Sequence, residues 1–430
     1  MTLAPERVPG WQDHARYGAL GLPLAFVALP LYVILPAHYG QTLGVPLALL
    51  GAVLLASRLL DALVDPWLGR WADRWLDART DHAPHGAWWP LAAGALVLAL
   101  GFAALFFPPV QGSTPLLWWC GVTVTVTCLA FSVCTITHQA WGSRLGGDAQ
   151  TRARWVAWRE GLGVLGVLLA NGLAASWGVG ALVTSLCLTL ALALWALWRA
   201  PAPPPRLIRA SAPPQRPHWA APWRHDEFRR LLLLYLVNGV AAAVPATLVL
   251  FFIRDVVQRE DLVGPLLAGY FLMAALGVPL WVRLIGRWGP SRAWALGMGA
   301  QVLAFSSVSW VGPGDVGLYT AVCLSSGFML GADLTAPGTL LTGVIQRAGP
   351  TGEASLAGVF TGWWQLATKL NLALAAGLAL PALGWLGYRP GVGDAASQSA
   401  LVMVYGVLPC LCKALALWAW WRLWARRGLE

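Results

Sequence analysis

The sequence predicts an all-α integral membrane protein with twelve transmembrane helices in two six-helix bundles and both termini in the cytoplasm. Three observations support this prediction: the apolar composition, the recurrence of long apolar runs, and the uneven distribution of Arg and Lys. The chain has 430 residues, of which 58% are hydrophobic and 11% are charged. Soluble domains carry about 25% charged residues, so this composition indicates a membrane protein.

Twelve apolar runs are long enough to cross the hydrocarbon layer of a bilayer, which is about 30 Å thick. We expect each run to be a helix, because lipid offers no hydrogen-bond partners to an exposed backbone. The spans predicted in the first half are residues 15–37, 45–66, 88–108, 114–137, 155–177 and 179–198. The spans predicted in the second half are residues 229–253, 262–284, 292–311, 316–342, 355–382 and 398–421.

The basic residues are distributed unevenly between the two sides of the predicted membrane. Of the 29 Lys and Arg, 23 fall on the side that holds both termini, three on the opposite side and three inside spans. This asymmetry is the positive-inside pattern and places both termini in the cytoplasm, with the protein in the inner (cytoplasmic) membrane of the cell. The formal charge of +10 is therefore explained by topology, and we expect no nucleic-acid partner.

The longest polar break separates the two halves of the chain. Residues 200–227 are rich in Pro and Arg and are expected to form a semi-extended cytoplasmic tether between bundles at 1–199 and 228–430. A Gly-Arg-Trp turn leaves the second span at residues 69–74, and a similar turn leaves the eighth at residues 286–292. Two related halves of six spans are typical of transporters built from parallel repeats, which favours a major facilitator fold.

Three ionisable residues, Arg58, Asp61 and Asp65, lie at or near the end of the second predicted span. At about 100° per residue they fall within about 60° of one another, on one helical face. A charge at bilayer depth costs at least about 3 kcal/mol on insertion scales, so such residues are functional candidates. Two acids on one face can bind Na⁺ or share a proton, and we expect Asp61 and Asp65 to form a cation-coupling site. The alternative is a permanent bridge that only holds helices together.

Lys369 lies deep in the eleventh predicted span of a chain with only two lysines. Lysine is a point charge whose protonation shifts on burial, whereas arginine stays charged. We expect Lys369 and Arg58 to be charge-pair partners of the acids, so that a bound cation changes which charges pair. Such a differential interaction can bias the equilibrium between inward- and outward-facing states. The second lysine, Lys413, is expected to extend toward the inner face.

Several further residues are candidates for contact with a solute. Gln365 lies one turn before Lys369, and the adjacent Trp364 is a candidate for stacking on the apolar face of a sugar. Asp333, in the tenth span, is a candidate for binding the substrate, and its segment, residues 331–338, is either a broken-helix gating segment or a helix end. His138 lies close to the cytoplasmic boundary, where an interfacial role is favoured over a proton relay.

No metal site or cofactor is expected, because the seven cysteines lie inside predicted spans without metal-ligand spacing. An integral-membrane enzyme would need an exposed catalytic cluster, usually on sizeable loops, and the predicted outer loops are short. We therefore expect a carrier and not an enzyme. Its expected partners are a small solute, a monovalent cation and the lipid bilayer, and a single bundle pair of this type is expected to work as a monomer.

The stretch RLLDALVDPWLGRWADR at residues 58–74 resembles the second-helix signature of the glycoside–pentoside–hexuronide:cation symporter family of the major facilitator superfamily. Residues 137–160, 228–239 and 331–338 resemble the corresponding parts of that family as well. The resemblance implies that Asp61 and Asp65 bind the coupling cation and that Lys369 lies near them.

The resemblance also implies roles for residues that the pattern alone does not single out. Arg159 matches an arginine at the family's substrate cavity, and Thr135 occupies the position of a third acid. Gly69, Asp73 and Arg74 match the turn after the second helix, which we expect to be a gating turn.

The leading functional hypothesis is symport of a sugar, glycoside or related small polar solute with H⁺ or Na⁺, by alternating access. Thr135 in place of an acid, and Val64 in place of an asparagine, remove oxygen ligands and make H⁺ at least as strong a candidate as Na⁺. The alternative hypothesis keeps the fold and changes the cargo to a lipid, a drug or an organic anion.

Overall fold

The computed structural model describes residues 9–77, 86, 88–176, 178–203, 219–348, 356–388 and 395–423, and their regular secondary structure is entirely helical. The chain forms two compact units. The first comprises Met1–Trp219 and Ile345–Trp363, and the second comprises Ala220–Val344 and Trp364–Glu430. The bundle boundaries expected from the sequence stay a prediction, and residues 204–218 of the expected tether lie outside the described residues.

The first unit is built on long helices that follow the predicted spans. These are α4 (Leu47–Asp77), α5 (Trp88–Phe106), α6 (Ser113–Arg144), α7 (Ala149–Ser176) and α8 (Gly178–Trp198). The first predicted span is instead a series of short elements. They are α1 (Trp11–Gly18), α2 (Gly21–Leu29), the π-helical turn η1 (Pro30–Ile34), α3 (Leu35–Ala37) and the π-helical turn η2 (His38–Thr42).

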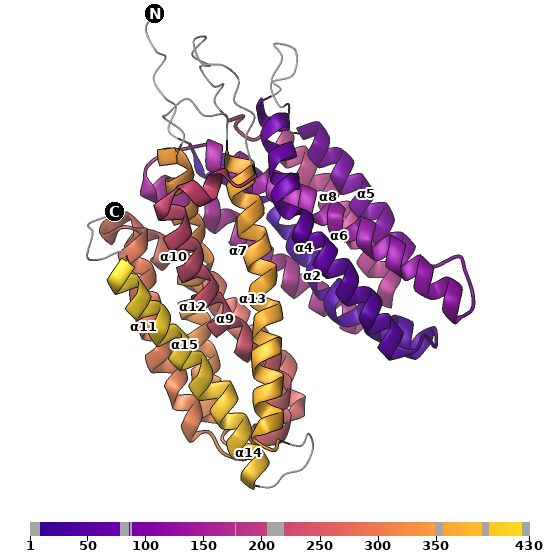
Figure 1. The fold of residues 1–430 in the computed structure, drawn as a ribbon, viewed down its shortest axis with the longest axis vertical. Helices are drawn as coiled ribbons and strands as arrows, with labels where there is room; N and C mark the ends of the chain where they lie inside the picture. Colours follow the sequence, from indigo (N-terminus) through magenta and orange to yellow (C-terminus); the bar gives the residue numbers. More distant parts are fainter. Residues whose placement is uncertain are drawn as a thin grey trace, which may run out of the picture. The chain divides into compact units, whose positions relative to one another are not determined.

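Prolines account for the interruptions of this first segment. Pro30 begins η1 and Pro36 lies in α3, and each lacks the backbone N–H that would donate to the carbonyl four residues earlier. Single π-helical turns are a common way of accommodating such a break. In the rest of the unit, α4 packs on α6, α6 packs on α5, and α2 packs on α7. Figure 1 shows α4, α5 and α6 side by side.

The first turn of α13 (Ala357–Trp385) belongs to this first unit and packs directly on α4. A Cβ atom at Gly69 would lie 2.1 Å from the carbonyl oxygen of Gly358, and one at Gly358 would lie 2.1 Å from the carbonyl oxygen of Gly69. The two backbones therefore approach so closely that only glycine fits at either position.

The second unit contains the remaining long helices, which pack around α15. Its α-helices are α9 (Asp226–Phe252), α10 (Val263–Trp288), α11 (Pro290–Ser306), α12 (Val316–Ala348) up to Val344, α13 from Trp364, α14 (Ala395–Val402) and α15 (Leu408–Leu423). Shorter turns are η3 (Ala221–Arg224), η4 (Ile253–Val257), η5 (Glu260–Leu262), η6 (Ser307–Trp310) and η7 (Met403–Val407). Both α9 and α11 pack on α15, and the rings of Phe252, Tyr319 and Tyr405 lie in its apolar core.

Eight helical runs of the described residues are long and apolar enough to cross a membrane. They are Trp88–Phe106, Ser113–Arg144, Gly178–Trp198, Asp226–Val257, Glu260–Trp288, Val316–Ala348, Ala357–Trp385 and Ala395–Arg422. The other four predicted spans are helical along most of their length. The total of twelve crossings, and the side on which the termini lie, stay predictions.

Candidate functional site

The two acids of α4, a helix of the first unit, are buried. Asp61 is 5% exposed and Asp65 is fully buried. Pro66 follows Asp65 within the helix and has no N–H to return to the carbonyl of Ala62, so the helical ladder is interrupted beside the acid. This placement agrees with the helical face that the sequence predicts. The expected cation-binding role stays a prediction.

Ser132 of α6 is a site residue that sequence reasoning missed. Its hydroxyl donates a hydrogen bond of 2.7 Å to Oδ1 of Asp61. Ser132 is 2% exposed, so the bond lies in the protein interior. Thr135, the candidate for the cation-coupling site on this helix, lies one turn later on α6, and its buried hydroxyl has no hydrogen-bond partner among the described residues. A serine inside an apolar helix is a weak signal in sequence, because such hydroxyls usually bond to their own helix.

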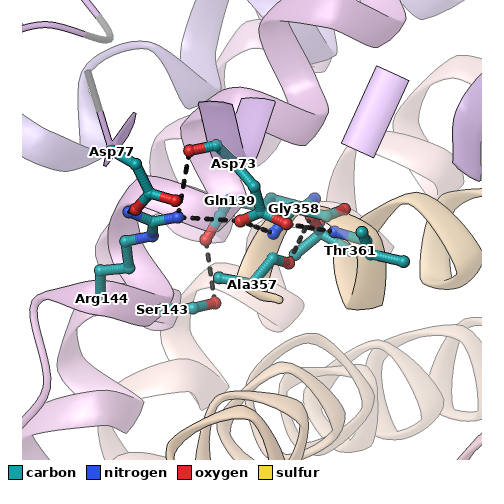
Figure 2. A network of polar contacts seen from close by, with 9 residues as sticks. Asp73, Asp77, Gln139, Ser143, Arg144, Ala357, Gly358 and Thr361 are labelled. Carbon is teal, nitrogen blue, oxygen red and sulfur yellow. Dashed lines mark hydrogen bonds and ion pairs between the residues drawn. The ribbon is translucent and has the colours of Figure 1, made fainter. Parts of the chain in front are cut away.

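The expected gating turn is part of a polar network at the end of α4 (Figure 2). Asp73 is 1% exposed and accepts a hydrogen bond of 2.9 Å from Nη2 of Arg144 on α6. Its carboxylate also accepts the backbone N–H groups of Gly358, at 2.7 Å, and Val359, at 3.0 Å. The other arm of Arg144 donates to Asp77 at 2.7 Å.

This network caps the beginning of α13 from outside the helix. The first N–H groups of a helix have no partner within it, and a carboxylate placed there satisfies them and interacts favourably with the helix dipole. Asp73 fills that position for α13. Gly69 sits one turn earlier at the close backbone contact, whereas Arg74 is exposed. Arg144 was not anticipated, because nothing local in the sequence links it to Asp73.

Arg159 lies on α7, and its guanidinium is largely covered. Its side chain is 15% exposed and its Nε donates to the carboxylate of Glu160 at 3.0 Å. His138 is 1% exposed, and its Nε2 lies 2.8 Å from the carbonyl oxygen of Tyr17. The structure therefore places His138 in the interior of the first unit, not at an exposed interface. The substrate-binding role of Arg159 is untested.

The expectation for Lys413 is wrong. Instead of extending to a surface, Lys413 is 4% exposed, and its Nζ donates to Oδ2 of Asp333 at 2.7 Å and to Oδ1 of Asn238 at 2.9 Å. Oδ1 of Asp333 also accepts from the Nδ2 of Asn238, at 3.0 Å, and from the Nε1 of Trp294, at 2.8 Å. This group joins four helices, α9, α11, α12 and α15. Lys413 stays buried because the carboxylate of Asp333 lies closer to its ammonium than any surface does.

The residues expected on α13 fall in the second unit. Trp364 is 6% exposed and stacks on Tyr235 of α9, with the ring centroids 3.8 Å apart. Gln365 is buried and Lys369 is half-buried. Arg58 is half-buried on α4 of the first unit. The pairing of Lys369 with the acids of α4 therefore stays a prediction, as does contact of Gln365, Trp364 or Asp333 with a solute.

No group of three or more His, Cys, Asp or Glu side chains that would hold a metal ion occurs among the described residues. The arrangement is thus a set of buried carboxylates, hydroxyls and ion pairs on helices. Chemically, such a set is suited to binding a small cation or a proton.

Solved structures with the same fold cover almost the whole chain. A bacterial homologue of the iron transporter ferroportin, in an outward-facing state, matches with a TM-score of 0.68 and 15% identity over 97% of this chain and 99% of its own. The E. coli fucose:proton symporter matches with a TM-score of 0.66 and 15% identity over 95% and 98%. The human organic anion transporter MFSD10 matches with a TM-score of 0.63 and 17% identity over 94% and 100%.

At these identities the likeness establishes the fold of major facilitator transporters and nothing finer. No curated protein sequence matches the chain. The family model described as "MFS/sugar transport protein" matches residues 16–424, which is nearly the full length. The chain therefore belongs to the MFS/sugar transport protein family, a family of multi-pass membrane transporters.

Proposed function

We propose that this protein is a secondary transporter that couples the uptake of a sugar or related small polar solute to H⁺ or Na⁺ by alternating access. The observation that supports the proposal most is the burial of Asp61 and Asp65 on one helix, next to the hydroxyl of Ser132. Buried carboxylates are costly to keep in a membrane protein, and a cation that binds them offsets that cost. A cation that binds one conformation better than the other shifts the equilibrium between them.

The family and the fold neighbours support the coarser part of this proposal. The family is described as one of sugar transport, and one structure of the same fold is a fucose:proton symporter. We infer by analogy that this chain also moves a polar solute together with a cation. The identity of the solute and the choice between H⁺ and Na⁺ are part of the proposal.

A non-sugar cargo is the second candidate, and the aromatic contacts favour it. One face of Trp364 is covered by Tyr235 at 3.8 Å, and Trp363 stacks on Trp219 with the ring centroids 5.8 Å apart. A sugar would therefore have to use the remaining faces of these rings. An organic anion needs no such stacking, and one neighbour of the same fold transports organic anions.

The cap on α13 suggests how the carrier is gated. The bonds from Gly358 and Val359 to Asp73 hold the start of α13 against α4. We propose that this cap forms in one conformation and breaks in the other, so that the turn from Gly69 to Arg74 contributes to the energy difference between them.

Uptake into proteoliposomes tests the coupling. Radiolabelled melibiose, D-xylose and D-glucuronate are offered separately under an imposed pH gradient and under an imposed Na⁺ gradient. We expect Asp65→Asn to abolish gradient-driven uptake while the protein stays folded, because an amide cannot release or bind a proton. The matched control is Asp261→Asn, which changes a carboxylate that is 62% exposed and paired with Arg259. Accumulation at the unmodified rate in Asp65→Asn would contradict the coupling assignment.

A further inference from the structure

Two polar contacts lie in the interface between α4 and α6, which we call the seam. The hydroxyl of Thr125 donates to the hydroxyl oxygen of Ser57 at 3.0 Å, and that of Ser132 donates to Asp61 at 2.7 Å. On α4 the two contacts are four residues apart and on α6 they are seven apart, so the helices run parallel here and both contacts face the seam. Ser57 is 5% exposed, so its hydroxyl is enclosed.

On the other side of the acids, the contact between α4 and α6 is apolar. Toward the Asp77 end of α4, the side chains of Leu68, Ala72 and Ile136 form a buried apolar cluster, with Val64 and Val133 packed against it. The acids therefore lie between a pair of hydroxyls on the Leu47 side and an apolar block on the Asp77 side. A proton moves along polar groups and not through such a block, because a charge in an apolar medium has no partner.

Ser57 and Asp61 are four residues apart on α4 and therefore share a helical face. One helical turn rises about 5.4 Å, so Ser57 lies about one turn from Asp61 along α4. A single bridging water, with two hydrogen bonds of about 2.8 Å, spans such a gap. Both hydroxyls also have alternative acceptors within reach, at 2.7 Å from Thr125 to the carbonyl of Gly121 and 2.9 Å from Ser57 to that of Val53.

We propose that Thr125 and Ser57 relay protons between the Leu47 end of α4 and Asp61, and that the coupling ion is H⁺. The inference rests on the proposed symport function. Each hydroxyl oxygen accepts an incoming proton as it releases its own to the next acceptor, so one proton leaves water at the Leu47 end and one arrives at the Asp61 carboxylate. Na⁺ is disfavoured on this route, because the two oxygens are in direct hydrogen-bonded contact at 3.0 Å and an ion would have to break that contact.

Other titratable groups face this part of the molecule. On α4 the neighbouring charge is Arg58, and α6 contributes the thiols of Cys120 and Cys128. The turn η2, which packs on α4, carries His38 and Tyr39. The helix α5, packed on α6, carries no titratable residue from Trp88 to Phe106.

The test compares two modes of transport in proteoliposomes for Ser57→Ala, Thr125→Val and the matched control Thr123→Val. Within the described part of the chain, the hydroxyl of Thr123 donates to carbonyls of its own helix, at 2.6 Å to Trp119 and 3.4 Å to Cys120. The probes are the melibiose, D-xylose and D-glucuronate named above. Uptake driven by a pH gradient requires net proton delivery, whereas equilibrium exchange of labelled for unlabelled sugar does not.

We expect both relay variants to lower the rate of pH-driven uptake at least about tenfold. This is less than the factor of about 10²–10⁴ that a positioned proton-transfer group contributes to a rate. Equilibrium exchange should stay within about twofold of the unmodified protein, and Thr123→Val should change neither rate. Unchanged pH-driven uptake in both relay variants, or a parallel loss of exchange, overturns the relay. Uptake by the unmodified protein that responds to Na⁺ and not to pH also overturns it, while leaving symport in place.

A measurement without cargo separates failure of the relay from failure of the proposed function. After a rapid drop in pH, the carbonyl stretch of the protonated acid is followed by infrared spectroscopy of the purified protein, and its loss in Asp61→Asn assigns the band. We expect protonation of Asp61 to slow at least about tenfold in Thr125→Val. If none of the three sugars accumulates under either gradient, the sugar proposal fails and this rate alone decides the relay; an unchanged rate overturns it.

Discussion

The acid of α12 and the acids of α4 present two ways of keeping a carboxylate inside a helical membrane protein. Asp333 receives three donors, among them the ammonium of Lys413, and its whole group is enclosed in the second unit. Asp61 accepts a hydrogen bond from a neutral hydroxyl, that of Ser132, in the first unit. A carboxylate that is paired with an ammonium and has all its oxygens occupied is suited to a fixed structural role.

A carboxylate that accepts from a neutral hydroxyl responds differently to protonation. Protonating Asp61 leaves the bond from Ser132 in place, because a hydroxyl can donate to a carboxyl group as well as to a carboxylate, whereas protonating Asp333 leaves the ammonium of Lys413 without its countercharge. The comparison teaches that intramembrane charge alone does not identify a coupling site. The partner of the charge distinguishes a structural pair from a candidate cation site.

The largest expected effect comes from breaking the fixed pair. We expect Lys413→Met to destabilise the protein by about 3–5 kcal/mol, because it leaves the carboxylate of Asp333 buried without its countercharge. The thermal unfolding midpoint of the detergent-solubilised protein, read by size-exclusion chromatography after heating, measures this loss. Adding Asp333→Asn to Lys413→Met should recover most of it, since a neutral pair of similar shape is tolerated.

The control for that experiment lies in the other unit. Asp61→Asn keeps a side-chain oxygen that accepts from Ser132, so we expect its unfolding midpoint to fall less than that of Lys413→Met. If Asp61→Asn destabilised as much as Lys413→Met, or if the double variant gained nothing over Lys413→Met, the distinction between the two regions would be lost.

An intermediate effect is expected at the cap of α13. Asp73→Asn keeps one carbonyl oxygen for the N–H groups of Gly358 and Val359 but loses the charge that pairs with Arg144. Hydrogen bonds to charged groups contribute about 1.5–3 kcal/mol, so we expect a loss in that range, again measured as the unfolding midpoint. Asp77→Asn, which is 38% exposed, is the matched control and should cost less. Equal losses would mean that the buried position of Asp73 does not matter.

The smallest effect is expected at the exposed start of α7. The side chain of Asp148 accepts the backbone N–H of Thr151 at 2.8 Å, and this bond, together with a side-chain bond from Thr151, lowers the pKa of Asp148. A lowered folded pKa means that the contribution is present above the unfolded value, about 3.9, and is lost as pH falls through the folded value.

We therefore expect Asp148→Ala to cost about 1 kcal/mol at pH 7, as removal of a helix N-cap does, and less below pH 3. Unfolding midpoints at the two pH values measure the difference. Asp148→Asn, which retains a capping oxygen, should lose less than Asp148→Ala at pH 7. A cost of Asp148→Ala that did not fall with pH would show that the charge of the cap contributes nothing.

Much of the local structure follows from sequence pattern. The apolar runs predict the long helices, and the spacing of Arg58, Asp61 and Asp65 predicts a shared face on α4. The prolines at 30 and 36 explain why the first segment is broken, although the sequence reasoning expected one continuous span there. The family also follows from sequence, because the match to its model covers residues 16–424.

The partners of the buried polar groups did not follow from sequence. Ser132 lies 71 residues from Asp61, and Lys413 lies 80 residues from Asp333. Lys413 was expected to extend toward the inner face, as a lysine near the end of a span often does. That expectation assumes that water is the nearest environment that stabilises the ammonium. A carboxylate on a neighbouring helix, at 2.7 Å, provided a nearer one.

By itself, the sequence determined the class of the protein: helices long enough for a bilayer, acids that share one helical face, and membership of a sugar transport family. These follow from composition and from periodicity along one helix, which are local properties of the chain. Tertiary structure alone decided which carboxylate pairs with Lys413, which one accepts the hydroxyl of Ser132, and which acid caps α13. The reason is physical, since a hydrogen bond or ion pair is fixed within about 3 Å, and only the packing of helices from distant parts of the chain sets distances on that scale.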